Sequence, residues 1–465
     1  MARSTTVHRC TACGAVSQRW LGRCPECGAW GALEPEEVAR DAHLGPSGQP
    51  AAAPVQLAAV DRHLAEPIPT GIGEFDRVLA GGLVPGSVTL VFGEPGVGKS
   101  TLLLQVLTAV AGTGRAVLLV SAEESAPQVR ARAERLGPMP DTLFVLATPD
   151  LAEAEAAVRS LGPALVVVDS VQTVADGAVG SPPGALAQVR ACVDGFARAA
   201  RANGAAVVLV GHVTKEGELA GPRALEHLVD TVVAFEGDRH HSLRVLRAVK
   251  HRFGPAGEVG LFEMGDRGLV DVADPGPLLL GDRRPEVPGS AVTALVEGRR
   301  SLVVEVQALA CAPMGGPPRR TALGLDARRL ATVVAVLDAR AGIAMGGVEV
   351  FASVAGGVKA TEPAVDLPLA LAVASAVAGV PLPDDLLSFG EIGLAGEVRQ
   401  VVAAGRRLAE AARLGFARAL VPRSAPEGPA SLEVVRVSTV TEAIRAALRP
   451  ARAVPAPRPL PVCAA

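Results

Sequence analysis

One short run carries the clearest chemistry in the chain. It reads Gly93-Glu94-Pro95-Gly96-Val97-Gly98-Lys99-Ser100 and fits the pattern G-x-x-x-x-G-K-[ST]. In this pattern glycines turn backbone N–H groups toward phosphate oxygens, the lysine reaches the β- and γ-phosphates, and the hydroxyl binds Mg²⁺. The apolar run 87–92 comes before it, and a helical stretch opens at Thr101. Residues 93–101 are therefore predicted to bind ATP, with Lys99 as a catalytic cation and Ser100 as a Mg²⁺ ligand.

Acidic residues at the ends of two other apolar runs are suited to complete this site. Residues 165–168 have the pattern of a buried strand and end in Asp169, a position suited to hold Mg²⁺; an ordinary helix N-cap is the alternative. Glu123 and Glu124 follow the run 117–120 and could orient or deprotonate the attacking water, or act as acids in the first turn of a helix. We predict Asp169 as a catalytic residue and metal ligand, and Glu123, ahead of Glu124, as the group that positions water.

Four cysteines near the N-terminus have the spacing of a metal site. The pairs Cys10-x-x-Cys13 and Cys24-x-x-Cys27 are separated by ten residues, and a glycine directly follows each pair. This spacing is typical of tetrahedral Cys₄ zinc. So short a module cannot bury a full core, so Zn²⁺ is expected to supply its folding energy. A redox pair is the alternative.

Lysine is rare in this chain. Of 45 basic residues only four are lysine, namely Lys99, Lys215, Lys250 and Lys359. An arginine fork replaces a P-loop lysine poorly, because the site needs a compact point charge. Codon bias, with the remaining lysines left by chance, is the alternative interpretation of this scarcity. The other three lysines are nevertheless candidates for phosphate contact, and the role of Lys359 stays open.

The elements that must position these residues follow from the apolar pattern. Short apolar runs at 87–92, 116–120, 164–168, 206–210 and 231–235 alternate with helical stretches. Such alternation favours an α/β fold with a parallel sheet covered on both faces. A chain of 465 residues is also expected to form two to four domains. We predict a zinc-ribbon-like finger at 1–33, a linker at 34–60, an ATPase domain at 61–275, a linker at 276–289, a second α/β domain at 290–447 and a disordered tail at 448–465.

The composition narrows the class of protein further. A net charge of −3 produces no overall basic field, so any contact with nucleic acid must be local. Aromatic residues are 3 % of the chain and tyrosine is absent, which disfavours extensive base stacking and leaves backbone electrostatics to dominate. The apolar stretch 367–382 contains prolines and is predicted as a buried core helix, not a membrane span. With no signal-peptide pattern and no disulfide framework, the expected location is the reducing cytoplasm.

Two further motifs, together with the cysteine module and the P-loop, occur in an order along the chain that resembles a known family. They are Gly211-His212-Val213-Thr214-Lys215-Glu216-Gly217 and Lys250-His251-Arg252-Phe253-Gly254. With the cysteine module before them and a region like a Lon-protease domain after them, the chain resembles the bacterial RadA/Sms DNA-repair proteins from about residue 8 to residue 447. The signature pentapeptide of that family is Lys-Asn-Arg-Phe-Gly. Here His251 stands in place of the asparagine, and its ring can supply a similar donor or acceptor.

The resemblance implies both a fold and an activity. Members of the family are RecA-like, DNA-dependent ATPases that use ATP, Mg²⁺ and Zn²⁺ and assemble into hexameric rings. They bind single-stranded DNA and process recombination intermediates, including by branch migration. A RecA-type recombinase is therefore an expected partner.

The basic residues of the two motifs are the candidates for DNA contact. Lys250 and Arg252, two apart on a strand, would share a face and reach either a neighbour's γ-phosphate, as catalytic residues, or DNA phosphate. A solvated basic edge is the alternative. Lys215 and Arg223 lie in a glycine-rich loop of the kind that faces the DNA channel in RecA-like folds, although an ordinary exposed loop would look similar. The loop 173–190 is a weaker candidate.

The Lon-like region lacks the groups that proteolysis needs. Leu369 stands where the nucleophilic serine of such a domain is expected, and no lysine follows near Gly405. Arg406 and Arg407 cannot act as neutral bases at pH 7. An ATP-dependent protease is therefore disfavoured. A RecA-like regulator that acts without DNA, through protein contacts, is the other alternative.

Overall fold

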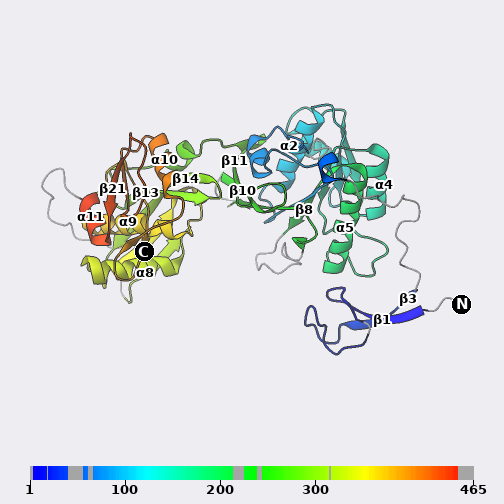
Figure 1. The fold of residues 1–465 in the computed structure, drawn as a ribbon, viewed down its shortest axis with the longest axis horizontal. Helices are drawn as coiled ribbons and strands as arrows, with labels where there is room; N and C mark the ends of the chain where they lie inside the picture. The colour runs from blue at the N-terminus through cyan, green and yellow to red at the C-terminus, as the bar shows by residue number, and fades with distance from the viewer. Residues whose placement is uncertain are drawn as a thin grey trace. The chain divides into compact units, whose positions relative to one another are not determined.

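The structure is a computed structural model and describes residues 4–17, 19–39, 56–60, 66–212, 225–237, 243–313 and 316–448. The chain divides into two compact units, Met1–Asp271 and Val272–Ala465 (Figure 1). This division lies close to the boundary expected at residue 275. Most of the expected tail, 449–465, lies outside the described residues.

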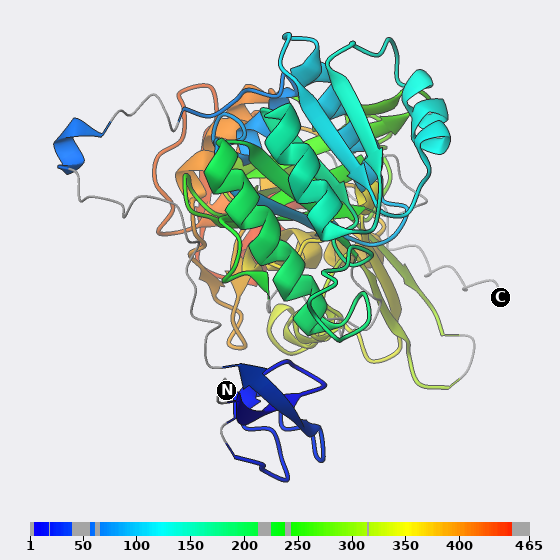
Figure 2. The ribbon, with the colours of Figure 1, turned by 90° about the vertical axis from the view of Figure 1, so that its right-hand side faces the viewer.

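A small antiparallel sheet carries the cysteines. Its strands are β1 (Ser4–Cys10), β2 (Val16–Ser17) and β3 (Leu33–Ala39), in the order β2-β1-β3. Figure 2 shows them in dark blue. Because β3 pairs with β1 from Leu33 to Ala39, the sheet continues into the segment expected as a linker from residue 34.

The larger sheet of the first unit has nine strands in the order β12-β11-β10-β9-β4-β8-β7-β5-β6. The parallel strands are β4 (Val88–Gly93), β5 (Val117–Ser121), β6 (Leu143–Ala147), β7 (Leu165–Asp169), β8 (Ala206–His212) and β9 (Thr231–Gly237). An antiparallel extension follows, made of β10 (Leu243–His251), β11 (Val259–Gly265) and β12 (Gly268–Asp271). All five predicted strands are confirmed to within two residues, whereas β6 and the extension were not predicted.

Alternate side chains of the parallel strands fill two separate cores. Val91 and Val167 point into the core that includes α1, α2 and α3, whereas their neighbours Leu90 and Val166 point into the core with α4 and α5. The helices are α1 (Gly73–Val78), α2 (Lys99–Ala111), α3 (Ala126–Glu134), α4 (Leu151–Leu161) and α5 (Leu186–Asn203). With both faces covered, the strands are apolar throughout and do not alternate with polar residues. This confirms the predicted α/β class.

Local sequence signals begin and end these helices. Ser125 and Gln128 form a capping box at the start of α3, in which the Ser125 N–H donates to Gln128 Oε1 over 2.9 Å. Helix α4 ends at Gly162, whose φ of 59° is left-handed. Because Ser125 is the cap of α3, neither Glu123 nor Glu124 is needed for that task.

The second unit is built on a seven-stranded sheet in the order β15-β16-β14-β13-β17-β20-β21. Its strands are β13 (Ser290–Glu297), β14 (Arg300–Cys311), β15 (Arg320–Leu323), β16 (Glu349–Val354), β17 (Leu386–Ser388), β20 (Arg418–Pro422) and β21 (Glu433–Val437), and β18 (Glu391–Ile392) pairs separately with β19 (Val398–Arg399). The helices are α7 (Gly276–Leu280), α8 (Ala327–Ala341), α9 (Asp366–Ala378), α10 (Ala404–Arg413) and α11 (Val440–Ala447). Helix α7 lies within the segment expected as a second linker.

Helix α9 is the apolar stretch that the sequence predicted as a core helix, and the prediction is confirmed. Every residue from Asp366 to Ser375 is buried. In the part of the chain that the structure describes, no helix is long and apolar enough to cross a membrane. Cys311, at the end of β14, is disulfide-bonded, a bond that the scattered cysteines did not predict.

Candidate functional site

The phosphate loop joins the end of β4 to the start of α2. Gly96 and Gly98 have φ values of 80° and 114°, which L side chains rarely adopt. A Cβ on Gly98 would lie 2.7 Å from Met264 Cε, so a side chain there would also displace the end of Met264. The loop therefore exposes backbone N–H groups at a helix N-terminus, the arrangement that binds phosphate.

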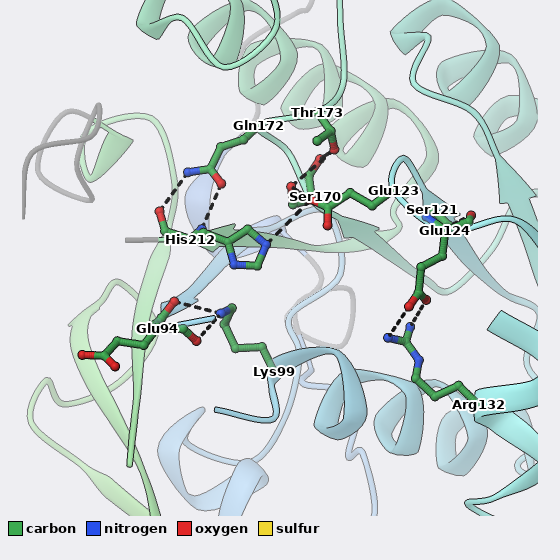
Figure 3. A network of polar contacts seen from close by, with 11 residues as sticks. Glu94, Lys99, Ser121, Glu123, Glu124, Arg132, Ser170, Gln172, Thr173 and His212 are labelled. Atoms are coloured by element: carbon green, nitrogen blue, oxygen red, sulfur yellow. Dashed lines mark hydrogen bonds and ion pairs between the residues drawn. The ribbon is translucent and has the colours of Figure 1, made fainter. Parts of the chain in front are cut away.

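Lys99 is the first residue of α2 and is 3 % exposed. Its Nζ donates to the carbonyl oxygens of Gly93 at 2.8 Å and Glu94 at 2.9 Å (Figure 3). Burial lowers the pKa of Lys99 to about 8, and the carboxylates of Asp169 and Glu123 partly oppose this shift. A buried ammonium between carbonyl groups is suited to receive the negative charge of a nucleotide phosphate.

Asp169 and Glu123 come to this cluster from two adjacent strands. Asp169 ends β7 opposite Ser121, the last residue of β5. Glu123 follows β5, and its Oε1 accepts a hydrogen bond of 2.6 Å from Ser170 Oγ. The structure therefore brings together Lys99, Glu123 and Asp169, which the sequence had selected from three separate segments.

Glu124 points to a different partner. Its carboxylate lies 3.0 Å from a guanidinium nitrogen of Arg132 on α3, and its carbonyl oxygen accepts from Ser121 Oγ at 2.7 Å (Figure 3). Of the two adjacent acids, Glu123 is the one whose charge acts on Lys99.

His212 belongs to the same cluster, although the sequence did not single it out as a site residue. It ends β8 directly beside Gly93, the last residue of β4. Its Nε2 lies 3.7 Å from Glu123 Oε1, while its buried Nδ1 has no hydrogen-bond partner in the described residues. Burial and the Lys99 ammonium both lower the pKa of His212, so the neutral ring is favoured.

Gln172 holds the backbone of His212 through both ends of its side-chain amide. Gln172 Nε2 donates to the His212 carbonyl oxygen at 2.9 Å, and the His212 N–H donates to Gln172 Oε1 at 3.0 Å (Figure 3). The loop after β7 is thereby fixed to the end of β8. The signal that could have identified His212 is its motif, which follows an apolar strand, as the P-loop does.

The Lys250 segment is engaged within its own unit. Lys250 Nζ donates to the carbonyl oxygens of Val229, at 2.8 Å, and Glu226. Arg252 donates to Asp230 Oδ1 at 2.8 Å, and the other oxygen of Asp230 accepts from the Val88 N–H at 3.0 Å. The register shifts between Ala248 and Lys250, which interrupts regular alternation at the end of β10.

This segment lies at the edge of the sheet opposite the P-loop. His251 pairs with Thr231, and Thr231 pairs with Thr89 near the start of β4. The P-loop follows the other end of β4, after Gly93, roughly 13 Å further along the strand. Arg252 therefore cannot contact a nucleotide bound to its own P-loop.

Arg252 also borders a cavity of about 320 Å³ that is rich in cations. Arg198 and Arg201 from α5 line it together with His227, and Asp194 is the one acid among the described residues that line it. Such a set suits an anion with several oxygens.

His251, which replaces the family's asparagine, keeps a side-chain hydrogen bond. Its Nδ1 lies 3.0 Å from Thr231 Oγ1, and burial lowers its pKa. The ring also meets Phe253 edge-on, with centroids 6.1 Å apart.

The remaining basic candidates are placed differently. Lys215 and Arg223 lie outside the described residues, in the segment that begins after His212. Lys359 is exposed in the second unit.

The four cysteines converge at the tips of two matching turns. Each turn closes with an N–H that donates back to the first cysteine carbonyl, from Gly14 at 2.8 Å and from Gly28 at 3.0 Å. Their φ values of 75° and 74° are nearly equal and left-handed, as the glycines predicted.

The thiols of this cluster fit Zn²⁺. All four Sγ atoms lie within 4.8 Å of one another; Cys10 and Cys27 are 3.7 Å apart, and Cys13 and Cys24 are 3.5 Å apart. A tetrahedral ion with Zn–S bonds of about 2.3 Å separates its sulfurs by about 3.8 Å. Burial raises the pKa of Cys13 to about 12, so zinc would displace a proton there.

The region expected to resemble a Lon protease contains no Ser–Lys dyad at the expected positions. Leu369 is fully buried in α9. Arg407 is also fully buried, and its guanidinium pairs with both oxygens of Glu362. Where a catalytic lysine was sought, the structure has an arginine that forms an internal ion pair.

Three family models match parts of the chain. Residues 63–218 match a model described as AAA domain, residues 8–35 a rubredoxin metal binding domain, and residues 339–425 the subunit ChlI of Mg-chelatase. Together with the site, these matches define the class: the chain is a RecA-like P-loop ATP hydrolase with an N-terminal zinc ribbon and a ChlI- or Lon-like C-terminal domain.

Comparison with whole proteins narrows this class to one family. A DNA repair protein RadA of Mycobacterium tuberculosis is 47 % identical over 451 residues, which cover 96 % of this chain and 94 % of the relative. The RadA proteins of Halalkalibacterium halodurans and Bacillus subtilis are 44 % and 42 % identical, each over 96 % of this chain and 100 % of the relative. The chain belongs to the RadA family of DNA repair proteins.

Proposed function

We propose that this DNA repair ATPase binds single-stranded DNA and couples ATP hydrolysis to movement of DNA strands in recombination intermediates, as in branch migration. One observation carries the proposal. His212 belongs to the cluster around Lys99, and the segment that contains Lys215 and Arg223 begins directly after His212. A change at the nucleotide phosphates that displaces His212 would therefore be transmitted along the backbone to the proposed DNA contacts.

The roles within the nucleotide site follow from the contacts. Backbone N–H groups of residues 93–101 hold the phosphates, and Lys99 compensates their charge. Ser100 and Asp169 would hold Mg²⁺, which when bound would supply further charge compensation. Glu123, oriented by Ser170, accepts a proton from the attacking water or holds that water in line.

His212 and Gln172 are proposed to couple the two ligands. The neutral His212 ring lies between Glu123 and Lys99 and can donate to a phosphate oxygen. Gln172 holds the His212 backbone at a fixed position relative to β7. A shift of the ring on hydrolysis would therefore move the start of the segment that follows β8.

Lys250 and Arg252 are proposed to act on the nucleotide of a neighbouring subunit. They lie at the sheet edge opposite their own P-loop, and Arg252 borders the cationic cavity. Lys250 holds the carbonyl groups of Glu226 and Val229, so its contribution includes positioning. This arrangement requires a homo-oligomer, and the family resemblance favours a hexameric ring.

The family resemblance also supports a RecA-type recombinase as partner and the cytoplasm as location. An ATP-dependent protease is disfavoured because Leu369 and Arg407 replace the dyad. A regulator that works without DNA is the remaining alternative.

The decisive experiment measures the ATP hydrolysis rate with and without single-stranded DNA, alongside a sizing measurement with nucleotide. We expect DNA to stimulate the rate severalfold and nucleotide to favour a ring. A rate unaffected by DNA, in a protein that hydrolyses ATP, would support the regulator instead.

A further inference from the structure

The two tryptophans of this chain lie exposed on the cysteine module. Trp20 and Trp30 are the only tryptophans in the sequence, and they are 61 % and 78 % exposed. The small core of the module consists of Leu33 and three of the cysteines, and neither ring belongs to it. Since folding does not use these rings, their apolar faces are available to a ligand.

The two rings gather around one glycine. A Cβ built on Gly22 would lie 3.8 Å from Trp30 Cζ3 and 3.9 Å from Trp20 Cη2. The backbone at Arg23 pairs with that at Trp30 as an isolated β-bridge, which fixes the second ring beside the Cys24 turn. Trp20, Gly22, Arg23 and Trp30 therefore form one surface, called here the tryptophan surface.

This surface is also cationic. The guanidinium carbon of Arg23 lies 6.0 Å from the Trp30 ring centroid, and Arg23 Nε donates to the Gly28 carbonyl oxygen at 2.9 Å. Within the described residues neither Arg19 nor Arg23 forms an ion pair, and no acidic residue lies between Arg19 and Cys24. Arg23 therefore carries its positive charge beside the Trp30 ring with no ion-pair partner among the described residues.

Planar aromatic faces next to unpaired cations fit one class of ligand. Unpaired nucleobases stack on tryptophan, while their phosphates attract arginine. In a duplex the base faces are covered by their neighbours, so only a single strand can offer them. An aliphatic protein surface would gain nothing from the guanidinium of Arg23.

We propose that the tryptophan surface binds unpaired bases of single-stranded nucleic acid by stacking on Trp20 and Trp30, with Arg23 contacting phosphate. The inference rests on the proposed function, because it names a second contact for the same strand. It is compatible with the expectation from composition that extensive base stacking is disfavoured, because the proposed stacking involves only the two rings of the zinc module.

The full-length protein contains its own probe for this test. Since both tryptophans are on the surface in question, the intrinsic tryptophan emission reports on nothing else. We expect an oligo(dT) strand to quench the emission in a saturable way, and a duplex of the same length to quench it much less. Equal quenching by the duplex, or no quenching by the single strand, would overturn the proposal.

Substitutions then separate stacking from general contact. Trp20→Ala and Trp30→Ala should each weaken oligo(dT) binding at least about fivefold, as loss of one stacked base does, and Trp→Phe should restore part of it. Leu21→Ala is the matched control, because Leu21 is 42 % exposed in the same turn but has no ring. Zinc content must stay unchanged in all variants. Equal losses in Leu21→Ala and the tryptophan variants would contradict stacking.

The outcome remains distinguishable from failure of the proposed function. Suppose that single-stranded DNA stimulates ATP hydrolysis, but that oligo(dT) does not quench the tryptophan emission and binds the tryptophan variants as tightly as the unchanged protein. The proposed function then stands and this inference fails. If DNA changes neither hydrolysis nor emission, both fail. Emission that responds to a protein partner, but not to oligo(dT), would assign the surface to protein recognition and overturn the proposal.

Discussion

At the scale of single residues, Lys99 is the P-loop side chain on which ATP hydrolysis is expected to depend. Its ammonium is buried between two backbone carbonyl groups and two acids whose charges act on it. Substitution Lys99→Ala removes the only side-chain cation of the P-loop. We expect ATP hydrolysis to fall at least a hundredfold, because the charge on the transferred phosphoryl group is no longer compensated. Phosphate release under saturating ATP measures this, and retained turnover would contradict the assignment.

The pKa of Lys99 also predicts how nucleotide binding depends on pH. Burial lowers it from 10.5 to about 8, so between these values the folded chain holds fewer protons than the unfolded chain. The destabilisation caused by burying this charge is complete below pH 8 and fades as pH rises toward 10.5. The negative charge of a bound nucleotide phosphate raises the pKa of Lys99 again. Nucleotide binding above pH 8 is therefore expected to be accompanied by uptake of a proton by Lys99.

Calorimetry can measure this proton uptake. At pH 8.5 the heat of ATP binding should differ between two buffers of different ionisation enthalpy, and the affinity should fall as pH rises further. At pH 7.5 the buffer dependence from Lys99 should be small, because the free site already holds most of its protons. Equal heats in both buffers at pH 8.5 would contradict the lowered pKa.

Gln172 provides a test of coupling that leaves the P-loop intact. Gln172→Ala removes both hydrogen bonds to the His212 backbone. We expect basal hydrolysis to change less than about threefold, while stimulation by single-stranded DNA is lost, since the end of β8 is no longer held. Gln128→Ala is the matched control, because it removes only a helix cap on α3. Normal stimulation in Gln172→Ala would exclude this route.

At the scale of elements, parallel strands decide which residues meet. The ends of β4, β5, β7 and β8 lie side by side, so residues from four segments form one cluster (Figure 3). The P-loop and Asp169 could be predicted, because each depends on the strand directly before it. The sequence ranked Glu123 ahead of Glu124, but the physical reason lies in the fold, which directs Glu124 to Arg132 and Glu123 to Ser170.

The cysteine module is an element whose order depends on its metal. Its core is too small to hold the two turns together. Substitution Cys27→Ser should lower zinc content severalfold or more, because a hydroxyl is a poor replacement for a thiolate ligand. Metal analysis of the purified protein measures this, with Cys192→Ser, a buried cysteine outside the cluster, as control. Full zinc retention in Cys27→Ser would contradict the site.

At the scale of the whole molecule, Arg252 predicts cooperation between subunits. Lys99→Ala impairs a subunit's own site, whereas Arg252→Ala should impair the neighbour's site. In a random equal mixture roughly a quarter of the interfaces unite an intact P-loop with an intact Arg252. We therefore expect mixing to restore hydrolysis that neither variant has alone. A mixture of Lys99→Ala with Glu123→Gln is the control and should not recover hydrolysis, because both substitutions impair the subunit's own site. If the mixture of Lys99→Ala with Arg252→Ala also fails to recover hydrolysis, Arg252 does not act in the neighbour's site.

The sequence by itself determined the P-loop motif, the paired cysteines, the apolar strands of the nucleotide domain and the missing protease dyad, whereas the order of those strands in the sheet came from the structure. These depend on short contiguous patterns, in which local backbone geometry and residue chemistry suffice. Only the tertiary structure decided that His212 joins the nucleotide cluster, that Arg252 lies at the opposite edge of the sheet, and that Trp20 and Trp30 remain exposed. Strand register and burial arise from contacts between residues far apart in the chain, and no local pattern specifies them.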